Sequence, residues 1–203
     1  MSVSPKKFEI TLVDIEKKLC MNWMESFKDY PDIKIHHGTF QLVKEFDCLV
    51  SPANSFGLMD GGIDLAIRNY FGMRLQYNVQ KIIQQEFYGE QPVGTSIIVD
   101  TENEEHPFLA HTPTMRVPMD ISNTDNVYNA MFAMLRAVTN FNKTSKYRIQ
   151  KVLCPGLGTA TGRVPFKEAA RQMAIAYHNF MNPTTNMDWG NLQRRNQRII
   201  GTN

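Results

Sequence analysis

The sequence predicts an α/β fold, namely a three-layer α/β/α sandwich around a mixed, largely parallel β-sheet. Short apolar runs of strand length alternate with longer segments whose apolar residues recur every three or four positions. No internal repeat, low-complexity segment or linker interrupts residues 8–181, so this alternation belongs to one unit. We expect one domain over residues 1–182 and a polar, basic tail over residues 183–203.

The first part of the chain has strands and one helix. Residues 8–13 (FEITLV) are a short apolar run bounded by charge, which is typical of a strand. Asp14 then offers an N-cap to a helix with apolar residues at helical spacing over residues 15–27. Alternation at residues 33–35 predicts a second strand. The mostly apolar run 46–51 predicts a third strand, buried on both faces.

The middle of the chain begins with two helical patterns, over residues 63–71 and 74–87. Strands are expected at residues 95–99 and 108–112, where apolar runs follow polar or proline-containing loops. Thr124 is placed to cap the next helix, which carries an apolar stripe.

The last strand is predicted at residues 149–154, before a loop rich in glycine and threonine. Pro165 suits the first turn of a final helix, and Pro183 ends it. The predicted order of elements is therefore βαββααββαβα.

Composition narrows the class of protein. The chain has 203 residues, of which 42% are hydrophobic and 21% charged, values that exclude a disordered, collagen-like or coiled-coil chain. No apolar run is long enough to span a membrane, and no signal peptide is visible. Three scattered cysteines (Cys20, Cys48 and Cys154) indicate reduced thiols and a cytoplasmic location. The net charge of +2 is too small to indicate nucleic-acid binding by itself.

Two loops stand out as candidate ligand sites. Residues 51–64 (SPANSFGLMDGGID) and residues 155–165 (PGLGTATGRVP) each connect the end of a predicted strand to the start of a helix. In open α/β sheets, ligands bind beyond the carboxyl ends of the strands, so both loops would lie at the same edge. Glycine exposes backbone N–H groups, and these bind anions near a helix N-terminus. Two facing loops of this kind would suit a diphosphate.

Other motifs are absent or weaker. Neither loop is a nucleoside-triphosphate P-loop or a G-x-G-x-x-G fingerprint, and no metal-binding spacing exists, so we expect no cofactor and no metal. Asn54 could cap the helix, stabilise the turn or contact a ligand. Asp64 is favourable in a first helical turn for dipole reasons alone. His111, on an apolar strand, is interpreted as a hydrogen-bonded core residue.

At these loops the sequence resembles the macrodomain family. Residues 47–54 (DCLVSPAN) and 61–67 (GGIDLAI) are similar to its strand, asparagine-bearing loop and helix start. Residues 152–159 (VLCPGLGT) and 165–170 (PFKEAA) are similar to its later phosphate loop and final helix. The agreement in element order covers roughly residues 8–181.

This resemblance implies an α/β/α fold with an ADP-ribose cleft. Asn54 would hydrogen-bond the distal ribose, and Asn54 and Asp64 are the implied catalytic pair in hydrolytic members. The implied ligand-binding residues all lie on the two loops: Asn54, Gly61, Gly62, Ile63, Asp64, Gly156, Gly158, Thr159, Ala160, Thr161 and Gly162. The implied partner is ADP-ribose or an ADP-ribosylated protein or metabolite, with no membrane involved.

Four positions depart from the family pattern. Thr39 stands where the family often has an aspartate that contacts adenine. Asp60 adds a negative charge beside the expected diphosphate, and Ala160 and Arg163 stand where glycine is common.

Four functions remain open at the level of sequence. The leading one is hydrolysis of a mono-ADP-ribosyl bond or of O-acyl-ADP-ribose by attack of water at the distal ribose. The others are a non-catalytic ADP-ribose-binding module, an ADP-ribose 1″-phosphate phosphatase, and a nucleic-acid binder that uses Arg194, Arg195 and Arg198.

Overall fold

The computed structural model describes residues 8–201, and its elements follow the predicted order with two additions. The strands are β1 (Glu9–Asp14), β2 (Ile33–His37), β3 (Cys48–Ser51), β4 (Ile97–Asp100), β5 (Phe108–His111) and β6 (Lys151–Pro155). The helices are α1 (Lys17–Ser26), α2 (Gly62–Phe71), α3 (Met73–Phe87), α4 (Asn126–Thr144), α5 (Phe166–Met181) and α6 (Trp189–Ile200). The additions are α6 and a 3₁₀ turn, η1 (Phe40–Leu42).

The six strands form one sheet in the order β2-β1-β6-β3-β5-β4. All neighbours are parallel except β4, which runs antiparallel to β5. This confirms the predicted mixed, largely parallel sheet. Because β1, β2, β3, β5 and β6 point the same way, their carboxyl ends meet at one edge of the sheet, which we call the carboxyl edge. The opposite edge is the amino edge.

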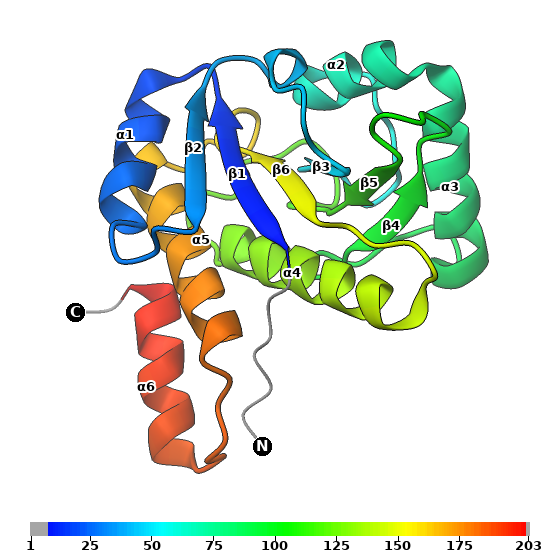
Figure 1. Ribbon diagram of the computed structural model, residues 1–203. Helices are drawn as coiled ribbons and strands as arrows, with labels where there is room; N and C mark the ends of the chain where they lie inside the picture. The colour runs from blue at the N-terminus through cyan, green and yellow to red at the C-terminus, as the bar shows by residue number, and fades with distance from the viewer. Residues whose placement is uncertain (1–7, 202–203) are drawn as a thin grey trace.

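Side chains alternate between two cores, one on each face of the sheet. Ile10, Val50 and Val152 belong to the core that also contains buried residues of α1, α4 and α5. Val13 and Leu153, at odd positions of the same strands, belong to the core under α2 and α3. Figure 1 shows the two helical layers on either side of the sheet. The period of two therefore produces the three-layer sandwich.

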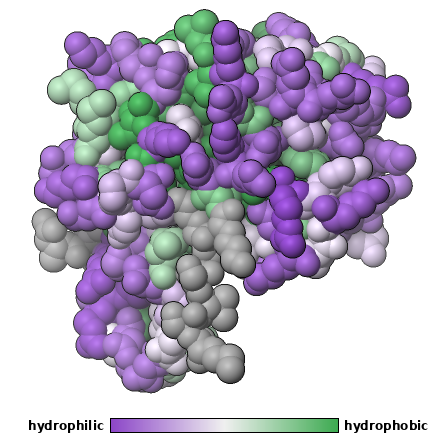
Figure 2. All heavy atoms as spheres, in the orientation of Figure 1, coloured by the Kyte–Doolittle hydropathy of each residue, from purple (hydrophilic) through white to green (hydrophobic). Residues whose placement is uncertain are grey.

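The helix α6 was not predicted, since the sequence suggested only a polar tail. It contacts α5, and Ile199 is buried there. Arg171 of α5 donates to the backbone oxygens of Arg198 and Ile199, at 2.6 and 2.8 Å. These bonds satisfy carbonyl groups that the last turn of a helix leaves free. In Figure 2, α6 and the segment before it extend below the main body as a mostly hydrophilic arm.

Two expected helix caps differ from the structure. Asp14 does not cap α1, whose N-cap is Glu16, but its Oδ1 accepts a hydrogen bond from the backbone N–H of Glu16 at 2.9 Å. Asp125, not Thr124, is the N-cap of α4. The Thr124 hydroxyl still accepts a hydrogen bond from the N–H of Asn126 at 3.3 Å. Both residues predicted as N-caps therefore lie within two residues of the observed N-cap of their helix.

Cys20, Cys48 and Cys154 are free and buried. Burial raises the pKa of all three thiols, which makes them poor nucleophiles. Between residues 8 and 201, no helix combines the length and the hydropathy that crossing a membrane requires.

Candidate functional site

The two loops predicted from the sequence lie at the carboxyl edge, as expected. One follows β3 and leads into α2, and the other follows β6 and leads into α5. The strands β3 and β6 are parallel neighbours, with Cys48 opposite Val152 and Leu49 opposite Leu153. The loops therefore begin side by side, at the place where an open α/β sheet binds ligands.

The first loop is held in shape by Asn54. Its Oδ1 accepts hydrogen bonds from the backbone N–H groups of Phe56 and Leu58, at 3.0 and 3.3 Å. Its Nδ2 donates to the carbonyl oxygen of Leu58 at 2.7 Å. The sequence left a turn-stabilising role open for this residue, and that is the role the structure gives it. The second amide hydrogen on Nδ2 remains for a ligand.

The end of the first loop offers unpaired backbone donors. Gly61 is the N-cap of α2 and Gly62 its first residue. Within the described part of the chain, no acceptor pairs with the N–H groups of residues 60–64. These groups lie at the N-terminus of a helix, where its dipole favours negative charge. The arrangement is one that binds anions.

The second loop has a similar supply of donors. Its fold is set by three backbone bonds: Val164 N–H to Gly158 O at 3.0 Å, Arg163 N–H to Ala160 O at 3.0 Å, and Ile121 N–H to Gly162 O at 2.9 Å. The N–H groups of residues 158–162 themselves donate to no described acceptor. The turn therefore uses its carbonyl groups internally and leaves a run of amides free, as an anion-binding loop requires.

Close packing fixes this second loop. A Cβ on Gly162 would lie 2.5 Å from the carbonyl oxygen of Gly158, so no side chain fits there. Gly158 has a φ of +69°, and a Cβ would lie 3.0 Å from side-chain atoms of both Ile121 and Val127. Both positions therefore need glycine to keep the observed turn.

Asp64 is the buried acid of the site. It lies in the first turn of α2, its side chain is 7% exposed, and the Ser51 hydroxyl donates to its Oδ1 at 2.5 Å. Desolvation raises the pKa of Asp64 to about 6, the Ser51 bond opposes the rise, and the charge of Asp60 adds to it. A carboxyl with a pKa near 6 can accept and release a proton near neutral pH.

Two side chains near the site were not singled out by the sequence as site residues. Asp14, at the end of β1, accepts a bond from the N–H of Gly156 in the second loop at 3.2 Å through Oδ2. Burial raises its pKa. Ser51, the partner of Asp64, is the last residue of β3. Parallel pairing of β1 and β3 with β6 brings them here, and that pairing has no signal in the sequence.

His111 lies opposite Ser51 in the β3–β5 register. It is fully buried, and its Nδ1 lies 2.7 Å from Oε1 of Gln91. Its Nε2 has no hydrogen-bond partner among the described residues. The sequence predicted a hydrogen-bonded core histidine, and the structure shows one whose Nδ1 alone is hydrogen-bonded. Burial lowers the pKa of His111 to about 3, which keeps the ring neutral.

The positions that depart from the family pattern have separate explanations. Thr39 is an exposed N-cap of η1 whose side chain makes no capping bond. Arg163 has a φ of +53° and lies 4.0 Å from Asp120, so it has a weak partner within the chain. Ala160 is exposed, and its carbonyl closes the turn with the N–H of Arg163. In residues 8–201 no three His, Cys, Asp or Glu side chains gather as metal ligands would.

Comparison with known proteins gives matches to one family. A sequence model described as "Macro domain" matches residues 50–173. A protein of Aquifex aeolicus, described only as uncharacterized, is 30% identical over 149 residues, which are 73% of this chain and 82% of that protein.

Two solved structures resemble the fold. The macrodomain of Mycobacterium tuberculosis DarG has a TM-score of 0.58 at 20% identity, and the match covers 70% of this chain and 87% of that one. A mutant of the Oceanobacillus iheyensis macrodomain, solved with ADPR, has a TM-score of 0.60 at 18% identity and covers 100% of this chain and 99% of that one.

Proposed function

The chain belongs to the macrodomain family, and we propose that it binds ADP-ribose and hydrolyses the bond between an ADP-ribosyl group and its carrier. The observation that carries the proposal is the pair of unpaired amide runs, residues 60–64 and 158–162, beside the buried carboxyl of Asp64. The Oceanobacillus iheyensis structure with ADPR, which shares the fold, supports the choice of ligand.

Binding would rest on backbone groups. The diphosphate of ADP-ribose carries two negative charges, and the two amide runs supply donors on the two loops that follow β3 and β6. The N-terminus of α2 adds the favourable end of its dipole. Backbone donors held by turns need no reorganisation when the ligand arrives, so the site is prepared for the anion before binding.

Hydrolysis would use Asp64 as a general base. Ser51 occupies Oδ1, and Oδ2 has no partner among the described residues, which leaves it free for a water molecule. Ionised Asp64 would accept a proton from this water while the water oxygen bonds to the anomeric carbon of the distal ribose. The bond from that carbon to the carrier breaks, and the proton passes on to the leaving atom.

Asn54 would position the distal ribose. One hydrogen of its Nδ2 and both acceptor sites of its Oδ1 are already used by the first loop. The remaining hydrogen can donate to a ribose hydroxyl. The hydrogen bonds of Asn54 within its own loop also favour a second candidate function, a non-catalytic ADP-ribose-binding module. An asparagine that holds the loop in shape contributes to ligand binding without taking part in a chemical step.

An assay on a mono-ADP-ribosylated protein, in which the anomeric carbon of the distal ribose is bonded to the carrier, tests the proposal. We expect the wild-type chain to release ADP-ribose, and the Asn54→Ala and Asp64→Ala variants to lose most of this turnover. Calorimetry with free ADP-ribose is run alongside. Tight binding without product would favour the binding module, and unchanged turnover in both variants would remove the assigned roles.

A further inference from the structure

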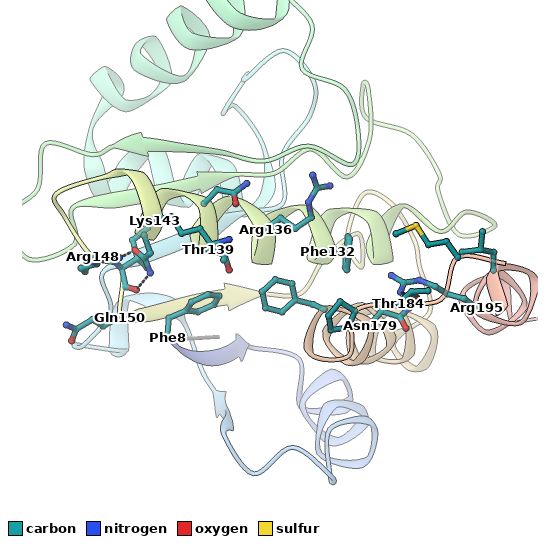
Figure 3. Close-up of a pocket in the computed structure, with 17 residues that line it drawn as sticks. Phe8, Phe132, Arg136, Thr139, Lys143, Arg148, Gln150, Asn179, Thr184 and Arg195 are labelled. Atoms are coloured by element: carbon teal, nitrogen blue, oxygen red, sulfur yellow. Dashed lines mark hydrogen bonds between the residues drawn. The ribbon is translucent and has the colours of Figure 1, made fainter. Parts of the chain in front are cut away.

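A large pocket lies at the amino edge of the sheet, away from the two loops. Its volume is about 1010 Å³, and it is lined by residues of α4, α5 and α6 and by the segments that precede β1 and β6. The strand β6 separates it from the second loop and has five residues, which corresponds to roughly 16 Å. Figure 3 shows the residues that line the pocket, arranged around α4.

The charge around this pocket is all of one sign. Arg136, Lys143, Arg148 and Arg195 line it, and none of its lining residues is acidic. Over residues 8–201, none of these four side chains forms an ion pair with a carboxylate. Unpaired cations that share one pocket produce a positive potential that attracts an anion.

The interior of the pocket is apolar. Behind the buried Phe8, Ile149 and Phe180, the accessible apolar surface of the lining comes from Phe132 and Leu192, which are partly buried, and Met187, which is 80% exposed. A simple inorganic anion would leave this apolar surface facing water. The pocket therefore fits a ligand that brings apolar groups together with its negative charges.

The cations follow a line instead of meeting at one point. Arg136 and Lys143 are seven residues apart on α4, which places them about 10 Å apart along one face of the helix. Figure 3 shows Lys143 and Arg148 at one end of the pocket and Arg195 at the other, with Phe8 between them. This spacing fits a chain that carries several negative groups.

The aromatic residues do not offer a stacking surface for nucleic-acid bases. Tyr128 is stacked on Phe132 with ring centroids 5.7 Å apart, and the guanidinium of Arg195 lies 5.7 Å from the centre of the same Phe132 ring. Phe8 and Phe180 are buried in the interior. Binding of single strands depends on open aromatic faces, and none of the three rings that line the pocket, Phe8, Phe132 and Phe180, presents one.

We propose that this pocket binds an acidic peptide segment of a partner protein, with carboxylates on the cations and an apolar side chain against Met187 and Leu192. The proposal is independent of the ADP-ribose site. Residues 1–7, outside the described range, carry Lys6 and Lys7 and no acid, so their charge does not match the pocket. A groove beside a helix is a recurrent site for such segments.

Fluorescence anisotropy tests the proposal. The probes are short fluorescein-labelled peptides that combine Glu or Asp with Leu or Phe at varied spacings, their counterparts with Lys in place of the acids, and labelled oligouridylate. We expect acidic peptides to bind, the lysine counterparts not to bind, and each of Arg136→Glu and Lys143→Glu to weaken binding about tenfold. Both side chains are exposed and make no hydrogen bond within the described residues, so the fold should be preserved.

Arg194→Glu is the matched control, because Arg194 is exposed on α6 but does not line the pocket. It changes the net charge as much as the test variants do, and we expect it to keep peptide affinity. Thermal unfolding checks that all variants fold. The proposal is overturned if no acidic peptide of the panel binds, if the pocket and control variants lose affinity equally, or if oligouridylate binds more tightly than the peptides.

Discussion

At the carboxyl edge of the sheet the unpaired donors are backbone N–H groups of residues 60–64 and 158–162, whereas at the amino edge they are side chains such as Arg136 and Lys143. The first arrangement adds no net charge and depends on the shape of two turns. The second depends on charge and tolerates small movements. A chain with a net charge of only +2 can therefore have two sites for anions. Neither site can be recognised from the net charge or the amino-acid composition.

The two edges also differ in their acids. The carboxyl edge contains Asp64, a buried carboxyl hydrogen-bonded to Ser51, and Asp14, which contacts the second loop. No carboxylate lines the amino-edge pocket. A binding surface needs only complementary charge, while a reacting site needs a group that exchanges a proton. We therefore expect chemistry at the carboxyl edge alone.

The largest effect should come from removing the proton acceptor. Replacing Asp64 by Asn keeps the shape of the side chain and an acceptor for Ser51, but it removes the base. We expect kcat for ADP-ribosyl hydrolysis to fall about 100- to 10,000-fold, with a much smaller change in ADP-ribose affinity. In the wild-type protein, kcat/KM for the proposed hydrolysis should rise with pH through about 6 and then level off. A flat profile together with full activity in the variant would contradict this role.

The same substitution should change stability in the opposite direction. Burial raises the pKa of Asp64 from 3.8 to about 6, so the folded state holds this proton more tightly than the unfolded state does. Its ionisation therefore costs stability, and the cost grows from pH 4 to 6 and is complete above that range. A shift of this size corresponds to roughly 3 kcal/mol.

Asp64→Asn should accordingly raise the free energy of unfolding at pH 8 by up to this amount and leave it nearly unchanged below pH 4. Urea denaturation at the two pH values measures the difference. A variant that is less stable than the wild type at pH 8 would show that the ionised carboxyl is stabilised by its surroundings.

The shape of the second loop gives the next effect. In Gly158→Ala, the φ of +69° and the new contacts at 3.0 Å with Ile121 and Val127 should shift the amides. We expect ADP-ribose affinity to fall about tenfold or more, as the loss of one or two well-placed bonds would imply. Calorimetry measures the change.

Gly89→Ala is the matched control, since Gly89 has a φ of +97° but no atom within 4 Å of its added Cβ. It should carry a similar backbone strain and keep ADP-ribose affinity. Equal losses in the two variants would attribute the effect to stability and not to the loop.

The smallest effect concerns salt and compares the edges directly. Raising salt from about 50 to 200 mM should weaken acidic-peptide binding severalfold, because exposed side-chain cations are screened. ADP-ribose binding should weaken less, since backbone donors contribute no net charge. Titration of both ligands across this range measures the two slopes. A steeper slope for ADP-ribose would show that side-chain cations, not amides, hold the diphosphate.

The sequence predicted the fold class, the element order and the positions of both loops, because periodicity and glycine content are local signals. Residues that meet only through the packing of whole elements could not be predicted. Asp14 reaches Gly156 only when β1 and β6 are side by side, and Ser51 reaches Asp64 only when α2 packs against the end of β3. The helix α6 was missed because its residues are mostly polar: Ile199 is the one that is buried, and Arg171 of α5 donates to its last carbonyl groups.

Asp60 illustrates the same limit. From the sequence, its charge beside a diphosphate had no explanation. In the structure its side chain is exposed and its charge contributes to the raised pKa of Asp64, while its own backbone N–H begins the first amide run.

The central claim is that the two amide runs hold the diphosphate of ADP-ribose next to Asp64. A crystal structure of the chain with ADP-ribose tests it most directly. We predict diphosphate oxygens at roughly 2.7–3.2 Å from backbone nitrogens of residues 158–162, with the distal ribose beside Asn54 and Asp64. Density for the ligand in the amino-edge pocket, or an empty carboxyl edge at saturating ADP-ribose, would contradict the claim.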